Sequence, residues 1–367
     1  LVREFTRDGR RCFSYAMDRP MMNFHAYLSG RWDVRKGDYK GLPIEVYHDP
    51  RHGYNVDRMI DSAKKSLGYF EQNFSPYQHR QLRIIEFPGY ADFAQSFANT
   101  IPYSETIGFI TDLRDPDEID YVFYVTAHEV AHQWWAHQVS GANVQGATML
   151  SESLAQYSAL MVMEREYGRD RMRQFLRYEL DRYLAGRGSE TLAELPLYRV
   201  ENQSYIHYQK GALTFYRLRE EIGEDALNRA LRRFLKQEAY QPAPYPRSVD
   251  LLALLREEAP PDQHALIEDL FEKITIYDNR VESATARRRT DGRYNVRLDL
   301  RAAKIHADGQ GRETPSGLDD WMEVGVFSAD PSASPLYLQR HRITDEAFTL
   351  DVVVDAKPDS AGLDPYN

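Results

Sequence analysis

The spacing of the apolar residues changes once along this chain, and that change limits what the chain can fold into. Between residues 54 and 275 the apolar residues recur with helical spacing, as in Val56 to Phe74 and Ala147 to Tyr167. After Ile276 the spacing becomes two, as in Tyr294 to Leu300. Helical spacing puts the apolar residues on one face of a helix, whereas a spacing of two puts them on one face of a strand. The two stretches therefore predict different secondary structures. We therefore expect a mainly helical part followed by a sheet-rich part.

These patterns divide the chain into three zones and predict an α+β multidomain fold. Residues 1–49 carry short mixed segments, with a strand-like run from Leu42 to Tyr47. This zone is too short for a core of its own, so we expect a remnant of an N-terminal β-sheet domain. Residues 50–275 form the mainly helical zone. Residues 276–367 predict a C-terminal β-sandwich, because strand-like segments alternate there with turn signals.

The composition is that of a folded, acidic chain. The 367 residues include 46 Lys and Arg and 56 Asp and Glu, which gives a formal net charge of −10. An acidic chain is a poor binder of nucleic-acid backbones, so we expect no nucleic-acid partner. No window reaches the roughly 18 apolar residues of a membrane-spanning helix. Cys12 is the single cysteine, which excludes an intrachain disulfide.

The segment His128-Glu129-Val130-Ala131-His132 carries the strongest chemical signal. On a helix, residues i and i+4 share a face, so both imidazoles can reach one metal ion, with Glu129 beside a water on that ion. The run from Ile119 to Thr126 precedes the motif, and we expect the motif near the start of a helix. The alternative without function is a surface helix that happens to carry two histidines and a glutamate.

Glu152 is the candidate for a third metal ligand. A catalytic zinc site uses three protein ligands and keeps one position for water. Glu152 follows His132 with 19 residues between them and lies in the next long helical pattern. Gly141 and Gly146 allow the chain to reverse, so two antiparallel helices can bring Glu152 to the ion. The alternative is a glutamate at a helix start, where the helix dipole favours negative charge. We predict one Zn²⁺ bound by His128, His132 and Glu152.

These residues resemble those of the M1 family of zinc aminopeptidases, within the gluzincin group. That family has HExxH, then 18 residues, then a glutamate in an Asn-Glu-Gly context. This chain has Ser151-Glu152-Ser153 and one more intervening residue, which the loop from Val139 to Ala147 can accommodate. The longer spacing is also that of thermolysin-like proteases, so spacing alone leaves both open. The resemblance implies a thermolysin-like, mainly helical catalytic domain with a small sheet over residues 50–275.

Two more segments resemble motifs of the M1 family. Pro102-Tyr-Ser-Glu-Thr106 occupies the place of a Gly-x-Met-Glu-Asn motif, whose glutamate binds the substrate's free α-amine and aligns with Glu105. Tyr208-Gln-Lys-Gly-Ala212 resembles a Tyr-x-Lys-Gly-Ala segment, whose tyrosine donates to the oxyanion in the transition state. The alternatives without function are an ordinary loop carboxylate for Glu105 and an aromatic residue packed in the core for Tyr208. Tyr205 is a nearby competitor for the second role.

The resemblance implies an enzyme that removes N-terminal residues from peptides, with Glu129 as general base for a zinc-activated water. Two other functions stay open: a thermolysin-like endopeptidase, and a peptide-binding or sensory domain of an ABC-type membrane complex with little turnover. We expect His137, Trp134 and Trp135 to pack rather than to ligate. Seven further histidines show no ligand spacing: His25, His48, His52, His79, His264, His306 and His341.

A narrower resemblance concerns the chain's surroundings. His128 to Tyr167, Leu195 to Ala212 and the ending Asp364-Pro-Tyr-Asn367 look like the peptidase domain fused to bacterial ABC-transporter-type permeases. The chain starts at Leu1 rather than Met, and we expect it to be a piece of a longer protein. The resemblance implies a tether to transmembrane segments outside this sequence and a membrane-associated, extracytoplasmic (periplasmic) location.

Overall fold

The computed structural model describes residues 1–115, 118–330 and 333–366. The chain divides into two compact units. The first unit comprises Leu1–Ala142 and Leu231–Pro246, and the second comprises Asn143–Ala230 and Arg247–Asn367. Both units combine helices with sheets, as the α+β prediction requires. Over the described residues, no helix has both the length and the apolarity needed to cross a bilayer.

A four-stranded sheet organises the first unit. Its strands run in the order β3 (Asp33–Tyr39), β4 (Leu42–His48), β5 (Leu82–Phe87) and β6 (Thr100–Ser104). β3 and β4 are antiparallel, whereas β4, β5 and β6 are parallel, with helix α1 (Val56–Asn73) as the crossover between β4 and β5. The carboxyl ends of the three parallel strands therefore meet at one edge of the sheet, the edge where ligand sites of such sheets are found.

The first 49 residues do not all fold together. β1 (Arg3–Arg7) and β2 (Arg10–Ser14) form a two-stranded hairpin, whereas β3 and β4 belong to the sheet of β5 and β6. The strand predicted from Leu42 to Tyr47 is thus confirmed as β4. Alternate residues of β4 are buried, with Ile44 and Val46 fully covered, because one face of this sheet packs against α1. The boundary at residue 49 stays a prediction.

Helix α2 (Tyr121–Ala131) carries the His-Glu-x-x-His motif at its end and not at its start, so that expectation was wrong. The run before the motif is rich in aromatic and β-branched residues, which suggests a strand. The run is nevertheless helical: nearly all of its residues are buried and α2 packs against α1, so tertiary contacts outweigh the local preference for a strand. Asp120 caps its first turn, because its carboxylate accepts a hydrogen bond from the Phe123 backbone N–H.

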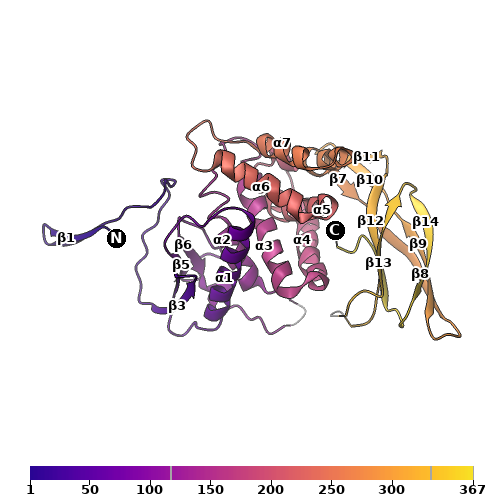
Figure 1. The fold of residues 1–367 in the computed structure, drawn as a ribbon, viewed down its shortest axis with the longest axis horizontal. Coiled ribbons are helices and arrows are strands. Elements are labelled where there is room, and N and C mark those ends of the chain that lie inside the picture. The colour runs from indigo at the N-terminus through magenta and orange to yellow at the C-terminus, as the bar shows by residue number, and fades with distance from the viewer. Residues whose placement is uncertain (116–117, 331–332, 367) are drawn as a thin grey trace. The chain divides into compact units, whose positions relative to one another are not determined.

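Helices form the first part of the second unit (Figure 1). The pattern from Ala147 to Tyr167 is confirmed as a π-helical turn, η2 (Met149–Ser153), followed by α3 (Leu154–Tyr167), which ends at Gly168 as expected. The remaining helices are α4 (Arg169–Ser189), η3 (Leu197–Arg199), η4 (Ile206–Lys210), α5 (Gly211–Ile222), α7 (Ser248–Glu258), η5 (Pro261–Gln263), α8 (His264–Ile267) and η6 (Glu268–Glu272). Helix α6 (Glu224–Glu238) begins in this unit, and its residues from Leu231 onward belong to the first.

Strands form the rest of the second unit. Among the residues that the structure describes, these strands form sheets with the orders β11-β10-β7, β13-β12-β15 and β14-β9-β8. Their strands are β7 (Ile274–Tyr277), β8 (Arg280–Arg288), β9 (Tyr294–Arg301), β10 (Lys304–Ala307), β11 (Glu313–Ser316), β12 (Asp320–Phe327), β13 (Tyr337–Ile343), β14 (Ala347–Val354) and β15 (Ser360–Leu363). Buried residues of β9, β12 and β14 form one apolar cluster, so the period of two seen in the sequence marks their covered faces.

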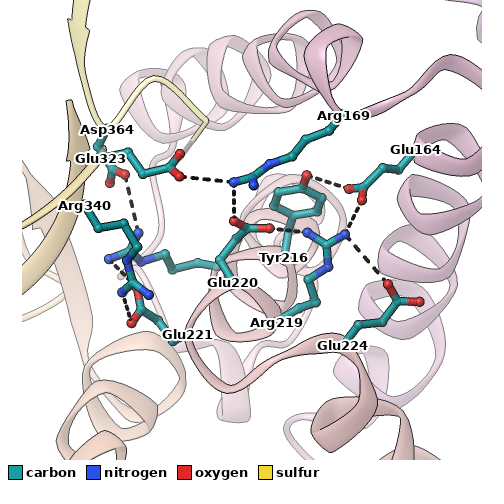
Figure 2. Close-up of polar contacts among 11 residues, drawn as sticks. Glu164, Arg169, Tyr216, Arg219, Glu220, Glu221, Glu224, Glu323, Arg340 and Asp364 are labelled. Carbon is teal, nitrogen blue, oxygen red and sulfur yellow. Dashed lines mark hydrogen bonds and ion pairs between the residues drawn. The ribbon is translucent and has the colours of Figure 1, made fainter. Parts of the chain in front are cut away.

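A network of ion pairs joins the helices of the second unit to its C-terminal strands (Figure 2). The guanidinium of Arg169 contacts Glu220 of α5 across 2.7 Å and Glu323 of β12 across 3.2 Å. Arg340 of β13 reaches Glu221 of α5. The three carboxylates are largely covered whereas both guanidinium groups are partly exposed, and the network links the helices of this unit to its strands.

Candidate functional site

Two histidines converge at the end of α2. The Nε2 atoms of His128 and His132 lie 3.0 Å apart, and the two rings are nearly perpendicular. Both side chains are buried, with 7% and 6% of their surface exposed. The Nδ1 atom of His132 donates to the carbonyl oxygen of Trp135 across 2.9 Å, since a carbonyl can only accept. In a neutral imidazole this leaves the lone pair on Nε2, the atom that faces His128.

This geometry fits a shared metal ion. Two Zn–N bonds of about 2.0–2.1 Å at a tetrahedral angle separate the nitrogens by roughly 3.3 Å, close to the distance seen here. An imidazole whose other nitrogen donates to a backbone carbonyl is also the usual state of a metal-bound histidine. The two Nε2 atoms thus lie close together, as the spacing of His128 and His132 predicts, and their role as metal ligands stays a prediction.

Glu129 and the residues after the motif are held by the loop before β6. The Ser96 hydroxyl donates to the backbone carbonyl of Glu129 across 2.9 Å and accepts from the Gln133 amide. The Glu129 side chain is buried at 5% exposure. His137 Nε2 donates to the Ser96 carbonyl across 3.0 Å, and burial lowers its pKa to about 4. His137 is a packing residue, as are the fully buried Trp134 and Trp135.

Glu105 lies at the edge where the parallel strands end. It is the first residue of η1 (Glu105–Phe109), directly after β6. Its Oε1 accepts from the Gly89 N–H across 2.8 Å, and its Oε2 lies 3.6 Å from His52 Nδ1. The third member of this group is Glu86, the penultimate residue of β5, which accepts from His52. His52, Glu86 and Glu105 are a group of side chains able to hold a cation.

The sequence did not identify His52 as part of any site. It lies 34 residues before Glu86 and 53 before Glu105, so no short motif connects them. The signal that was available is positional. Each residue lies at or just after the end of a strand, and parallel strands bring their carboxyl ends to one edge.

Glu152 belongs to the second unit and lies in η2. Its neighbour Ser153 donates from Oγ to the carbonyl oxygen of His207 across 2.6 Å. Gly211, the first residue of α5, faces the same serine, and a Cβ built there would lie 2.3 Å from Ser153 Oγ. A glycine is therefore required at 211 for η2 and α5 to approach this closely. The serine after Glu152, where the M1 pattern has glycine, has a structural role in linking η2 to η4.

Tyr208 lies in η4, one residue after the carbonyl that Ser153 binds. Its ring contacts the His207 ring with centroids 4.6 Å apart, and it is half-buried. Tyr205 is more deeply buried and stacks on Tyr183 at 6.0 Å. Tyr205 thus packs on α4, whereas Tyr208 is partly exposed. Glu152 and Tyr208 thus lie on two turns that one hydrogen bond connects.

Comparisons with known proteins agree with this set of motifs. The model of the Peptidase family M1 domain matches residues 58–272. Aminopeptidase M1-B of Oryza sativa subsp. japonica is 26% identical over 260 residues, covering 67% of this chain and 29% of the relative. Endoplasmic reticulum aminopeptidase 2 of Homo sapiens is 26% identical over 215 residues, covering 55% and 22%.

A solved structure supports the fold. The crystal structure of Legionella pneumophila aminopeptidase A in complex with aspartic acid covers 89% of this chain and 36% of its own, with a TM-score of 0.56 and 18% identity. The chain spans less than a third of the length of the two curated relatives named above. The family model nevertheless covers more than half of this chain, including both histidines, Glu105, Glu152 and Tyr208. The chain is a member of peptidase family M1.

Proposed function

We propose that this chain is the catalytic part of a zinc-dependent aminopeptidase that removes N-terminal residues from peptides. The observation that carries the proposal is the histidine pair: two buried Nε2 atoms 3.0 Å apart, one with its tautomer set by a backbone carbonyl. Membership in the M1 family supports the reaction class, and the aminopeptidase names of the relatives support the substrate class.

His128, His132 and Glu152 would hold the ion, because each offers one suitable ligand atom, a ring nitrogen or a carboxylate oxygen. A zinc ion bound there supplies an acidified water and polarises the scissile carbonyl. Replacing the third ligand tests this assignment. Glu152→Ala is expected to lower the zinc content in elemental analysis, whereas the exposed control Glu201→Ala keeps it. Full zinc occupancy in Glu152→Ala would refute the role of Glu152.

Three other side chains would transfer the proton, stabilise the oxyanion and bind the substrate's ammonium group. The Glu129 carboxylate takes a proton from the attacking water and passes it to the nitrogen of the leaving amine. The Tyr208 hydroxyl donates a hydrogen bond to the oxygen on which negative charge develops. The Glu105 carboxylate binds the ammonium group of the substrate and so places the first peptide bond for attack. Each assignment follows from the M1 motif that the residue matches.

One peptide series with free and with acetylated amino termini tests the proposal. The series is incubated with zinc-loaded protein, with and without chelator. Cleavage of the free peptides alone, lost with chelator, is the expected result. Cleavage of both forms would indicate the thermolysin-like endopeptidase instead. Cleavage of neither, with zinc bound, would indicate the peptide-binding or sensory domain.

The proposal also covers the domains of the chain, its attachment to a membrane and its location. We infer a thermolysin-like catalytic domain over residues 50–275 and a β-sandwich over residues 276–367, supported by the apolar cluster shared by β9, β12 and β14. Residues 1–49 would be the remnant of an N-terminal sheet domain. The resemblance to permease-fused peptidases supports a membrane tether and an extracytoplasmic location. Protease accessibility of the native protein in intact cells and spheroplasts would test that location.

A further inference from the structure

The carboxylate proposed to bind the substrate's ammonium group has one hydrogen-bond donor and one imidazole beside it. Glu105 accepts from the Gly89 N–H at Oε1 and lies 3.6 Å from His52 Nδ1 at Oε2. The same Nδ1 atom donates to Glu86 Oε1 across 2.5 Å. One imidazole N–H thus lies between two carboxylates, one from the end of β5 and one from the start of η1.

Burial assigns different tasks to the two carboxylates. The Glu86 side chain is 5% exposed, and its second oxygen accepts from the backbone N–H of Asp49. Both of its oxygens therefore have partners inside the protein. The Glu105 side chain is 27% exposed, so a ligand can reach it. His52 is intermediate, at 19%. From the interior outward the order is Glu86, His52, Glu105.

The backbone around this group is fixed as well. His52 lies in the loop between β4 and α1, and that loop ends at Asn55, whose amide donates to the carbonyl oxygens of Gly108 and Thr111. These bonds tie the loop of His52 to η1 and its end, the segment that begins with Glu105. Gly89 allows its backbone to lie close to the start of η1, because a Cβ at this position would be 2.6 Å from Thr106 Cγ2.

The charges of the group suit a cationic ligand. Two carboxylates face one imidazole, and the nearby guanidinium of Arg51 is paired with Asp49 across 2.9 Å. The group therefore carries excess negative charge, which an arriving ammonium ion offsets. Of the two carboxylates, Glu105 is the one that solvent reaches, so its orientation determines how strongly the group attracts the ammonium ion.

We propose that His52, anchored by Glu86, is a positioning residue that fixes the Glu105 carboxylate for the ammonium group of the substrate. This inference rests on the proposed function, because it assigns to His52 and Glu86 a share of the selectivity attributed to Glu105. His52 acts through Glu105 and does not touch the scissile bond.

The experiment compares kcat/KM for one peptide with a free and with an acetylated amino terminus. His52→Ala is expected to lower kcat/KM for the free peptide by about tenfold or more, mainly through KM, whereas the acetylated peptide should stay at the background rate that it shows with the parent. His52→Asn should recover most of the loss, since its amide can donate from near the position of Nδ1. His25→Ala, an exposed histidine of the same unit, is the matched control and should behave like the parent.

A double-variant cycle separates positioning from a general loss of structure. In a Glu105→Ala background, His52→Ala should cause no further loss for the free peptide, because its effect passes through Glu105. Glu86→Gln should resemble His52→Ala. If Glu86→Gln fails to fold, as shown by its thermal unfolding, the two His52 variants still decide the question.

The remaining outcomes are distinct. If Glu105→Ala leaves the preference for free termini intact, the proposed function fails. If Glu105→Ala abolishes that preference and both His52→Ala and a folded Glu86→Gln keep it, only the positioning role is overturned. Elemental analysis supplies the last readout. A second zinc ion per chain, lost in His52→Ala, would overturn the proposal and assign the group to a metal.

Discussion

The Nδ1 atom of His132 donates to the carbonyl oxygen of Trp135, three residues further along the chain. This bond leaves the Nε2 lone pair pointing toward His128, which is the orientation that the proposed metal site needs. A ligand that binds only the folded state stabilises it, by about 2.7 kcal/mol at 100 times its Kd. Adding zinc to metal-free protein should therefore raise the melting temperature of the parent and leave that of His132→Ala unchanged.

The control for this measurement is His25→Ala, which should respond to zinc like the parent because His25 is exposed and distant in sequence from the motif. Elemental analysis of the same samples should show less zinc in His132→Ala. A His132→Ala protein that binds zinc fully and melts later in its presence would contradict the assignment.

Glu129→Gln should separate metal binding from turnover. The Glu129 side chain is buried, and the backbone carbonyl of this residue accepts a hydrogen bond from the Ser96 hydroxyl. Glutamine keeps the size of the side chain but cannot take a proton from water. We expect unchanged zinc content and a loss of kcat of about 10²–10⁴, the usual share of a positioned acid or base. Activity within a few-fold of the parent would exclude the general-base role.

Tyr208→Phe should reduce kcat by about 10²–10³ with a smaller change in KM, since a donor to a developing oxyanion acts in the transition state. Tyr205→Phe is the matched control. Its ring is packed on Tyr183, and burial raises the pKa of its hydroxyl, so it is expected to act on stability rather than on kcat. The opposite pattern, with kcat lost in Tyr205→Phe, would move the role to Tyr205.

Much of the fold follows from periodicity, and the exceptions have physical causes. The helical spacing from Val56 predicts α1, which buries one face, and the pattern from Ala147 predicts η2 and α3, although α3 is buried on all sides from Leu154 to Met163. The run before His128 misleads, since its aromatic and β-branched residues favour a strand. Contact with α1 and burial on nearly all sides override that local preference.

The site was predictable where it is local and not where it depends on topology. His128 and His132 are four residues apart on a helix, so their pairing is visible in the sequence. The contact of His52 with Glu86 depends on which strands are parallel and on the length of α1 between them. The same holds for the hydrogen bond from the Ser153 hydroxyl to the His207 carbonyl. It depends on how closely two helical turns approach, which the sequence around Ser153 does not predict.

Gly211→Ala should weaken the protein and its zinc binding together. The added methyl group would lie 2.3 Å from Ser153 Oγ, so η2 or α5 must move. Overpacking of this kind costs about 1–3 kcal/mol. Because η2 carries Glu152, its displacement should also lower zinc content. The double variant Gly211→Ala with Ser153→Gly removes most of the clash and should recover part of both losses.

The control for this variant is Gly188→Ala in α4, where a Cβ would meet no atom within 4 Å. Alanine is the better helix former, so this change should leave stability equal or slightly higher. Thermal unfolding and zinc content measured on all three variants decide the matter. Parent-like melting of Gly211→Ala would show that the packing there is loose.

His79 should make the metal-free protein less stable as the pH falls from 6.5 toward 4. Burial lowers its pKa to about 4, helped by the charge of nearby His137, and its Nε2 atom has no hydrogen-bond partner among the residues that the structure describes. Between pH 4 and 6.5 the unfolded chain therefore binds more protons at this residue than the folded chain does. Stability rises with pH across that window and is fully present above it. One histidine contributes a slope of at most about 1.4 kcal/mol per pH unit. Urea unfolding at pH 5 and pH 7.5 should show a smaller drop for His79→Phe than for the parent, and an equal drop would mean that His79 titrates normally.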